Sequence, residues 1–171
     1  MEITINGKPT DLEIQEITLL SVEEAEALLT SDRSSLRWMT PDDLKRWCWL
    51  RTSGDTPTDE TYYAAVLDHG NNVRLNGCDV GEDCGVRPAM RVSTQLTKGD
   101  VFEAGGESWT MLNNELAYCD RIVAQSRYRR DSGASDANDY EKSDIKKWLE
   151  NWALKKGIYT TAQMEQMQGR A

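Results

Sequence analysis

Four short apolar runs separated by glycine-containing turns constrain the fold of this chain more than any other feature. The runs are 47–51, 62–67, 72–76 and 86–92, and the glycines that punctuate them are Gly54, Gly70, Gly77, Gly81 and Gly85. Apolar runs of this length, bounded by turn residues, are typical of β-strands. The connections are rich in Asp, Asn, Thr and Gly, a composition that turn chemistry largely explains. The centre of the chain is therefore predicted to be a meander of short strands.

The N-terminal segment is predicted to hold a strand pair and a capped helix. Residues 3–5 and 12–19 alternate weakly and flank an Asn-Gly pair, which is common in hairpin turns. The spacing of Ser and Glu in 21–24 is that of a capping box, so a helix is expected from there to about Leu29. A second, short helix is expected after Thr40, where a proline and two acids follow a capping hydroxyl.

The C-terminal segment is predicted to hold a hairpin, a further strand and the clearest helix of the chain. Residues 101–103 and 109–112 flank a Gly-Gly pair, and 116–122 reads as the next strand. In the helix expected at 143–156, the apolar positions follow the i, i+3, i+4, i+7 spacing of one face. These positions are Ile145, Trp148, Leu149 and Trp152. Gly157 suits a left-handed helix stop.

The length of 171 residues suits one domain, which buries roughly two-thirds of the surface that its unfolded chain exposes. A plausible break near 97–100 divides it into a first half, 1–96, and a second half, 97–159, which we expect to pack as one domain. Residues 160–171 are expected to be a tail. The predicted fold class is α+β, with an irregular, mostly antiparallel sheet and a few flanking helices.

Charge and hydropathy exclude several classes of function. Twenty Lys and Arg oppose 29 Asp and Glu, which gives a net charge of −9 and a field that repels phosphate backbones. Nucleic acid is therefore a disfavoured partner. No window approaches the length of apolar sequence that spans a membrane, and no secretory signal is visible, so we expect a cytoplasmic protein.

The four cysteines are most simply reduced thiols in a cytoplasmic setting. Cys48 lies between two tryptophans and is predicted to be a small core residue. Cys78 and Cys84 are separated by five residues, and a bond between them is geometrically possible if their loop closes. A zinc knuckle usually has two to four intervening residues and a second ligand pair, so metal ligation is disfavoured. We expect no metal and no cofactor.

Side chains that could carry chemistry each have a simpler explanation. His69 is the one histidine, and its position at a probable turn favours an exposed residue over a general base. Asp79, Glu82 and Asp83 could contribute to a calcium site, but a solvated acidic loop is favoured because calcium needs six to eight oxygen ligands. No enzymatic activity is therefore expected.

Arginines give two further expectations. The basic stretch 121–130 is expected to pair with the acidic loop 131–139 that follows it, rather than with nucleic acid. Arg51 and Arg87 lie in apolar strands, where an unpaired charge is costly. Both are predicted to be structural pins that join strands to loops, with an anion clamp as the open alternative.

Several motifs together resemble an uncharacterised family of domains in gut Firmicutes and their phages. They are WCWLRTSG (47–54), YYAAVLDHGNNVRLNG (62–77), GVRPAM (85–90), LLSVEEAEALL (19–29) and NDYEKSDIKKWLENW (138–152). The family carries WWLRSPG and GVRPAL segments at corresponding places. In many relatives the segment like KWLENW precedes the segment like WLRTSG, so the order here suggests a permuted version.

The WLRTSG and GVRPAM half also resembles the C-type-lectin-like fold of formylglycine-generating enzymes and of variable proteins diversified by retroelements. The resemblance implies a scaffold that presents loops for ligand binding; the reactive cysteine motif of the oxidising enzymes is not matched here. Many loop residues are of types that adenine-directed mutagenesis of Asn codons can give, although Glu60 and Glu82 are not. The fitting residues are Asp55, Thr56, Tyr62, His69, Arg74, Asn76, Cys78, Asp79, Asp83 and Cys84.

The leading hypothesis is a non-enzymatic binding module of phage or prophage origin, with loops 52–84 as its surface. Its partner would be a protein or a glycan, and the phage origin implies a place in the host cytoplasm or in the virion. The predicted binding residues are Asp55, Thr56, Tyr62, Tyr63, His69, Arg74, Asn76, Asp79 and Asp83. The alternative is an acidic phage inhibitor of a host defence nuclease, which mimics nucleic acid. Oligomeric state does not follow from the sequence.

Overall fold

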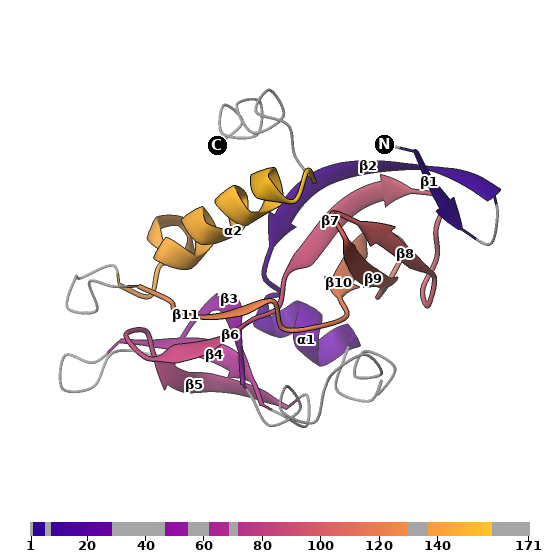
Figure 1. Ribbon diagram of the computed structural model, residues 1–171. Helices are drawn as coiled ribbons and strands as arrows, with labels where there is room; N and C mark the ends of the chain where they lie inside the picture. The colour runs from indigo at the N-terminus through magenta and orange to yellow at the C-terminus, as the bar shows by residue number, and fades with distance from the viewer. Residues whose placement is uncertain are drawn as a thin grey trace.

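The computed structural model of the chain describes residues 2–5, 8–28, 47–54, 62–68, 72–129 and 137–158. Within these residues the backbone forms two β-sheets and two α-helices (Figure 1). Nearly all neighbouring strands run antiparallel, which confirms the predicted α+β class with a mostly antiparallel sheet.

The six-stranded sheet has the order β1-β2-β7-β10-β9-β8, and each neighbouring pair in it is antiparallel. Its strands are β1 (Glu2–Ile5), β2 (Lys8–Thr18), β7 (Ala89–Thr94), β8 (Val101–Ala104), β9 (Glu107–Met111) and β10 (Leu116–Cys119). The outermost strands β1 and β8 contact each other, so the sheet curls on itself (Figure 1). A register shift between Ile14 and Glu16 on β2 supplies an irregularity that bends a long strand.

The five-stranded sheet has the order β11-β6-β3-β4-β5 and is less regular. Its strands are β3 (Cys48–Ser53), β4 (Tyr63–Leu67), β5 (Val73–Asp79), β6 (Asp83–Val86) and β11 (Ala124–Arg127). The parallel contact between β3 and β6 consists of one residue pair, Cys48 with Gly85. Register shifts interrupt both the β3–β4 and the β4–β5 pairings.

The run 86–92, predicted as one strand, is divided between the two sheets. Strand β6 ends at Val86, and β7 begins at Ala89 in the other sheet. Pro88 lies between them and has no backbone N–H to donate to a strand ladder, which explains the break. Residues 87–88 are therefore a short connection at which the chain passes directly from one sheet to the other.

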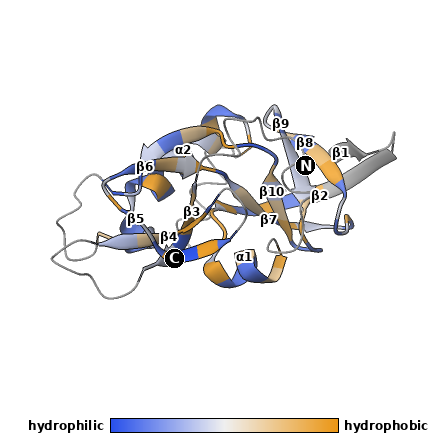
Figure 2. Cartoon of the chain, turned by 90° about the horizontal axis from the view of Figure 1, so that it is seen from below, coloured by the Kyte–Doolittle hydropathy of each residue, from blue (hydrophilic) through white to orange (hydrophobic). Residues whose placement is uncertain are grey.

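Local sequence signals for helices and turns are confirmed where the structure describes them. The capping box forms: the backbone N–H of Glu24 donates to Ser21 Oγ at 3.1 Å, and that of Ser21 donates to Glu24 Oε1 at 2.9 Å. Helix α1 (Val22–Leu28) follows and carries both hydrophobic and hydrophilic residues (Figure 2). In the β8–β9 hairpin, Gly105 and Gly106 have φ of 62° and 76°, as a two-residue primed turn requires.

Helix α2 (Asp144–Lys155) confirms the clearest helix prediction. Its N-cap Ser143 accepts a hydrogen bond from the N–H of Lys146 at 3.1 Å, and Gly157 has φ of 73°, the left-handed stop expected after the helix. A short 3₁₀-helix, η3 (Tyr140–Lys142), precedes it. Helix α2 packs against β2 and β11, so it lies across elements of both sheets (Figure 1).

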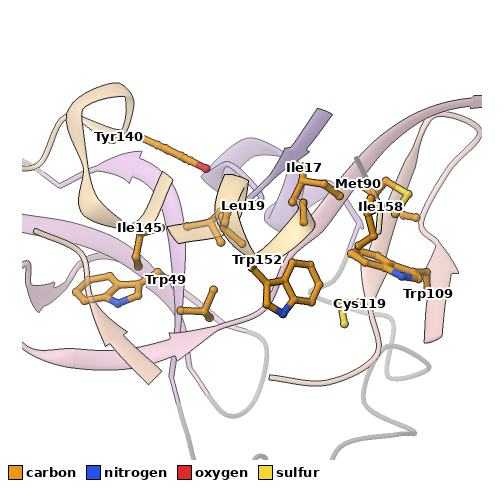
Figure 3. Packing of buried hydrophobic residues seen from close by; sticks show 14 of the residues in the cluster. Ile17, Leu19, Trp49, Met90, Trp109, Cys119, Tyr140, Ile145, Trp152 and Ile158 are labelled. Atoms are coloured by element: carbon orange, nitrogen blue, oxygen red, sulfur yellow. The ribbon is translucent and has the colours of Figure 1, made fainter. Parts of the chain in front are cut away.

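One hydrophobic cluster runs through both sheets and under α2. Trp49 and Ile145 lie at one end of it and Trp109 and Ile158 at the other, with Trp152 between them (Figure 3). Both Trp49 and Trp109 are fully buried. Strands from both sides of residues 97–100 share the six-stranded sheet and this cluster.

Some predicted elements lie outside the described residues: the Asn6-Gly7 turn, the helix start at Thr40 and the tail 160–171. Strand β11 and helix η3 were not predicted. No helix in the described part of the chain is long and apolar enough to cross a membrane.

Candidate functional site

A polar groove of about 490 Å³ lies between helix α2 and the edge strand β11. Residues from β6, β11 and α2 line it. They are Asp83, Gln125, Ser126, Arg127, Asp144, Lys147, Trp148 and Asn151. Seven of these eight side chains are polar or charged, and Trp148 is the one aromatic ring.

The helical wall follows directly from the helix period. Asp144, Lys147, Trp148 and Asn151 are spaced i, i+3, i+4, i+7, so they form one stripe along α2. The neighbouring stripe, which includes Ile145, Leu149 and Trp152, is buried in the core. Burial of that stripe fixes the rotation of the helix about its axis and turns the polar stripe toward β11. The apolar periodicity of the helix thus positions half of the groove.

Hydrogen bonds hold strand β11, the other wall of the groove, both to its own sheet and to helix α2. The indole Nε1–H of Trp49 donates to the carbonyl of Ser126 at 2.8 Å, which ties β11 to the centre of its sheet. The backbone N–H groups of Asp144 and Ile145 donate to the carbonyl of Tyr128 at 3.1 and 3.4 Å. These contacts join the end of β11 to the first turn of α2, so the two walls of the groove are fixed relative to each other.

The groove combines both signs of charge. Asp83 and Arg127 are directly paired across β6 and β11, and both side chains are exposed. Among the described residues, neither they nor Lys147 takes part in an ion pair. Trp148 is half-buried and stacks on Trp152, with ring centroids 6.2 Å apart and planes at 16°. Its indole is therefore positioned by a second indole behind it.

The sequence-predicted binding residues do not gather in one place. Asp83 lines the groove, whereas Tyr62, Tyr63, Arg74, Asn76 and Asp79 belong to the region of β4 and β5. Three strands separate β5 from β11 in the sheet order, so Arg74 and Asn76, within β5, lie away from the groove. The chain after Asp79 turns back toward β11, because the N–H of Tyr128 donates to the carbonyl of Val80 at 3.0 Å. The remaining predicted residues, Asp55, Thr56 and His69, lie outside the described part of the chain.

Several residues near β4 and β5 have structural partners. Arg74 pairs with Asp68 at 3.1 Å, and its guanidinium lies 5.3 Å from the ring centroid of Trp47. Asp79 Oδ1 accepts from the N–H of Gly81 at 2.8 Å and so caps its own turn. Asn76 is exposed.

Tyrosines at this edge are also engaged. The backbone N–H of Gly54 donates to the carbonyl of Tyr63 at 2.8 Å, and Asn138 Nδ2 donates to it at 3.1 Å. Tyr62 is half-buried against the main hydrophobic cluster, and its carbonyl accepts from the N–H of Val80 at 3.1 Å. These two residues thus hold the strand ends together.

Both arginines predicted to be structural pins are confirmed. Arg51 Nη1 donates to the carbonyl of Leu19 at 2.7 Å and to Glu24 Oε1 at 2.5 Å. Burial alone would raise the pKa of Glu24, but its hydrogen bonds and charged neighbours outweigh that effect and lower the pKa. Arg87 is buried; its Nε–H donates to the carbonyl of Cys119 at 2.6 Å, and its guanidinium lies 4.0 Å from the Tyr118 ring centroid.

In the basic stretch 121–130, Arg121 forms a two-pronged ion pair with Glu107, at 2.5 and 2.7 Å. Arg121 follows β10, which pairs with β9, the strand that carries Glu107. Most of the acidic loop 131–139 lies outside the described residues, so the expected pairing of the stretch with that loop stays a prediction. Lys156 also donates to Glu107 at 3.3 Å. Burial would raise the pKa of Glu107, but these cations lower it below the usual range.

Most of the residues that line the groove were not predicted from the sequence as binding residues. Strand β11 reads AQSR and has no apolar signal, so its residues gave no indication of a strand. The polar stripe of α2 could have been found, because its i, i+3, i+4, i+7 spacing lies beside the apolar stripe. Within the described residues, no three His, Cys, Asp or Glu side chains are grouped to hold a metal ion.

The groove therefore has defined walls, one supported aromatic ring, and three charged side chains, Asp83, Arg127 and Lys147, without an ion-pair partner in the described part of the chain. Protein-family models, curated proteins and solved structures give no match to this chain.

Proposed function

We propose that this chain is a non-enzymatic binding module, and that the groove between α2 and β11 takes a glycan. The observation that carries the proposal is the polar lining of the groove around Trp148, with three charged side chains that have no ion-pair partner among the described residues. Most small-molecule pockets are lined mainly by apolar side chains with a few polar groups, so a lining that is mainly polar suits a ligand that is itself dense in polar groups.

The donors and acceptors of the groove suit hydroxyl groups. Arg127 and Lys147 only donate hydrogen bonds, Asp83 in its charged form only accepts, and the amides of Gln125 and Asn151 do both. A sugar hydroxyl both donates and accepts, so a dense set of hydroxyls can satisfy this mixture. The Trp148 indole adds an apolar face with a polar edge, which can lie against the C–H groups of a sugar ring.

A large protein interface is less well supported by the described surface. Broad protein-binding surfaces are often marked by contiguous exposed apolar patches. Among the described residues, Leu75 is the one large hydrophobic side chain that is exposed, at 39%, and it lies on β5 away from the groove. This distribution favours a small polar ligand over a broad protein contact at the groove.

As part of the same proposal, we assign the chain to a C-type-lectin-like scaffold of phage or prophage origin, diversified in its loops. The support is coarse: within the described residues, short strands form two mostly antiparallel sheets, with two α-helices. Strands β4 and β5 occupy 63–67 and 73–79, so the variable surface would be formed by the connections and strand ends within 52–84. Asp83 would belong to both that surface and the groove.

The acidic inhibitor of a nuclease is the second candidate, and the net charge of −9 favours it. Binding to a nuclease through mimicry of nucleic acid would weaken steeply with salt, since it rests on exposed charges. Glycan binding at a groove of mixed charge would change little with salt. Salt dependence therefore separates the two candidates.

A glycan array probed with the wild-type chain tests the proposal. We expect binding to a restricted set of glycans, weakened tenfold or more by Trp148→Ala, which corresponds to about 1.4 kcal/mol. Lys147→Ala should weaken binding as well. Lys155→Ala is the matched control, because Lys155 is exposed on the same helix but does not line the groove.

Two results would contradict the groove assignment. The first is that the wild-type chain binds no glycan on the array. The second is that Tyr63→Ala and Asn76→Ala weaken binding while Trp148→Ala does not, which would move the site to the β4–β5 edge. Circular dichroism of each variant establishes that the fold is retained.

A further inference from the structure

We propose that Cys78 and Cys84 are a redox-active pair that closes into an intramolecular disulfide by exchange with a small neutral or cationic disulfide. The two cysteines are at the end of β5 and within β6, strands that are not neighbours in the sheet order. Their sulfurs nevertheless lie 2.9 Å apart, with the Cys84 thiol donating to Cys78. The proposal is independent of the groove and of its ligand.

A tight turn brings the two sulfurs together. The N–H of Gly81 donates to Asp79 Oδ1 at 2.8 Å, and the N–H of Glu82 donates to the carbonyl of Asp79 at 2.9 Å. Three further hydrogen bonds, at 3.0 to 3.1 Å, hold Val80 between the start of β4 and the end of β11. These hydrogen bonds therefore already close the loop that a disulfide between Cys78 and Cys84 requires.

Formation of the disulfide requires little rearrangement of the structure. A disulfide has sulfurs about 2.05 Å apart, so the pair has to approach by about 1 Å. Side-chain rotation within the loop can supply much of this distance. All four cysteines are buried, and Cys78 and Cys84 are 8% and 7% exposed. The contact between the two sulfurs is what the proposal rests on.

The two thiols differ in acidity. The hydrogen bond from Cys84 lowers the pKa of Cys78, although burial and the charges of Glu82 and Asp79 oppose this shift. The same hydrogen bond raises the pKa of Cys84, and burial adds to the rise. Because the thiolate is the nucleophile in exchange, Cys78 is the attacking residue and Cys84 the resolving one.

The exchange balances without a metal or cofactor. The Cys78 thiolate attacks one sulfur of the disulfide RSSR; its S–S bond breaks and a thiolate RS⁻ leaves. The Cys84 thiol passes its proton to that thiolate and attacks Cys78 Sγ, so that the second RS⁻ leaves and takes up a proton. Two protein thiols are oxidised to one disulfide, and RSSR is reduced to two RSH.

Acidic residues around the pair set the class of oxidant. Asp79, Glu82 and Asp83 lie in or next to the turn that covers the sulfurs. Their field repels an anionic disulfide and attracts a cationic one. We therefore expect cystamine, which is cationic, to oxidise the pair at least tenfold faster than oxidised glutathione at low salt. Added salt should reduce this difference.

Tryptic mapping of the full-length chain tests the proposal directly. Residues 75–91 form one tryptic peptide, because cleavage after Arg87 is blocked by Pro88. After treatment with cystamine, this peptide should lose the mass of two hydrogens and resist alkylation. Dithiothreitol should restore two alkylatable thiols. In Cys84→Ser, the cystamine moiety should remain on Cys78 as a mixed disulfide.

Pairs of matched variants test the separate roles of the two cysteines and of the acidic residues. Cys78→Ser should acquire the adduct on Cys84 at least tenfold more slowly than Cys84→Ser acquires it on Cys78. Glu82→Gln should narrow the rate difference between the two oxidants, while Glu103→Gln, on an exposed position of β8, should not. Two alkylated thiols in the oxidised wild-type peptide, or a mixed disulfide that persists in the wild-type chain, would overturn the proposal.

Discussion

The six-stranded and five-stranded sheets share a hydrophobic core but differ in how their strands pair. All neighbours in the six-stranded sheet are antiparallel, and one register shift interrupts them. The five-stranded sheet has two interrupted pairings and a parallel contact of a single residue pair. The candidate groove and the cysteine pair both lie in the less regular sheet.

This difference in strand pairing indicates that the two sheets have different roles. The regular sheet buries its polar groups with partners: Asp120 accepts from Ser108 Oγ at 2.8 Å and from Thr110 Oγ1 at 2.6 Å. In the five-stranded sheet the outermost strand β11 borders the groove, whereas the outermost strands β1 and β8 of the six-stranded sheet contact each other. Sites placed on loops and edges, and held by a rigid scaffold, are the usual arrangement for binding.

The largest expected effect tests whether the regular sheet is the more rigid part. Trp109→Ala should lower the free energy of unfolding by about 3–5 kcal/mol, the usual range for a fully buried tryptophan. Trp49→Ala should cost less, because the interrupted strands around it can relax into the cavity. Urea denaturation followed by circular dichroism measures both. An equal or larger loss for Trp49→Ala would refute the proposed difference in rigidity.

A smaller effect is expected at the joint between the sheets. Arg87→Met should lower the free energy of unfolding by about 2–3 kcal/mol, because it leaves the carbonyl of Cys119 without its charged donor and removes the cation from the Tyr118 ring. Arg91→Met is the matched control: its ion pairs are partly exposed, so it should cost about 1 kcal/mol or less. Thermal and urea unfolding of the two variants should preserve this order; a reversed order would show that Arg87 is not a stabilising joint.

Local signals in the sequence predicted most of the elements, because helices and strands are encoded within a few residues. The capping box at Ser21 and the apolar face of α2 needed no knowledge of the rest of the chain. The exceptions have local reasons too. Strand β11 is short and polar, and the run 86–92 carries apolar residues through Pro88 into another sheet.

Strand order and the groove depend on contacts that local patterns do not contain. Strand β2 pairs with β7, and β10 pairs with β7 on its other side, although long segments of chain separate them. Asp83 was predicted as a binding residue from its loop, but its neighbour Arg127 comes from β11, whose position depends on Trp49. The groove forms only where these distant segments meet.

The smallest of the three effects concerns one carboxylate from each region, whose contribution to the free energy of unfolding should depend on pH. The side chain of Glu107, on β9, is 4% exposed, whereas that of Glu24, in α1 beside the five-stranded sheet, is 20% exposed. Both have a pKa lowered from the ordinary value of 4.5, because their cationic partners outweigh the effect of burial. Each carboxylate therefore stabilises the fold above pH 4.5, and this contribution disappears as the pH falls through the lowered pKa.

Glu107→Gln should consequently lower the free energy of unfolding by about 1 kcal/mol at pH 7, since Arg121 and Lys156 are partly exposed and their charges are screened. Glu24→Gln should cost less, because its carboxylate is more exposed. Urea midpoints at pH 7 and pH 3 should show that the difference between wild type and each variant shrinks in acid. A difference that stays constant down to pH 3 would mean that packing, and not charge, accounts for the loss. A larger cost at Glu24 than at Glu107 would place the stronger buried ion pair beside the irregular sheet and reverse the comparison between the two regions.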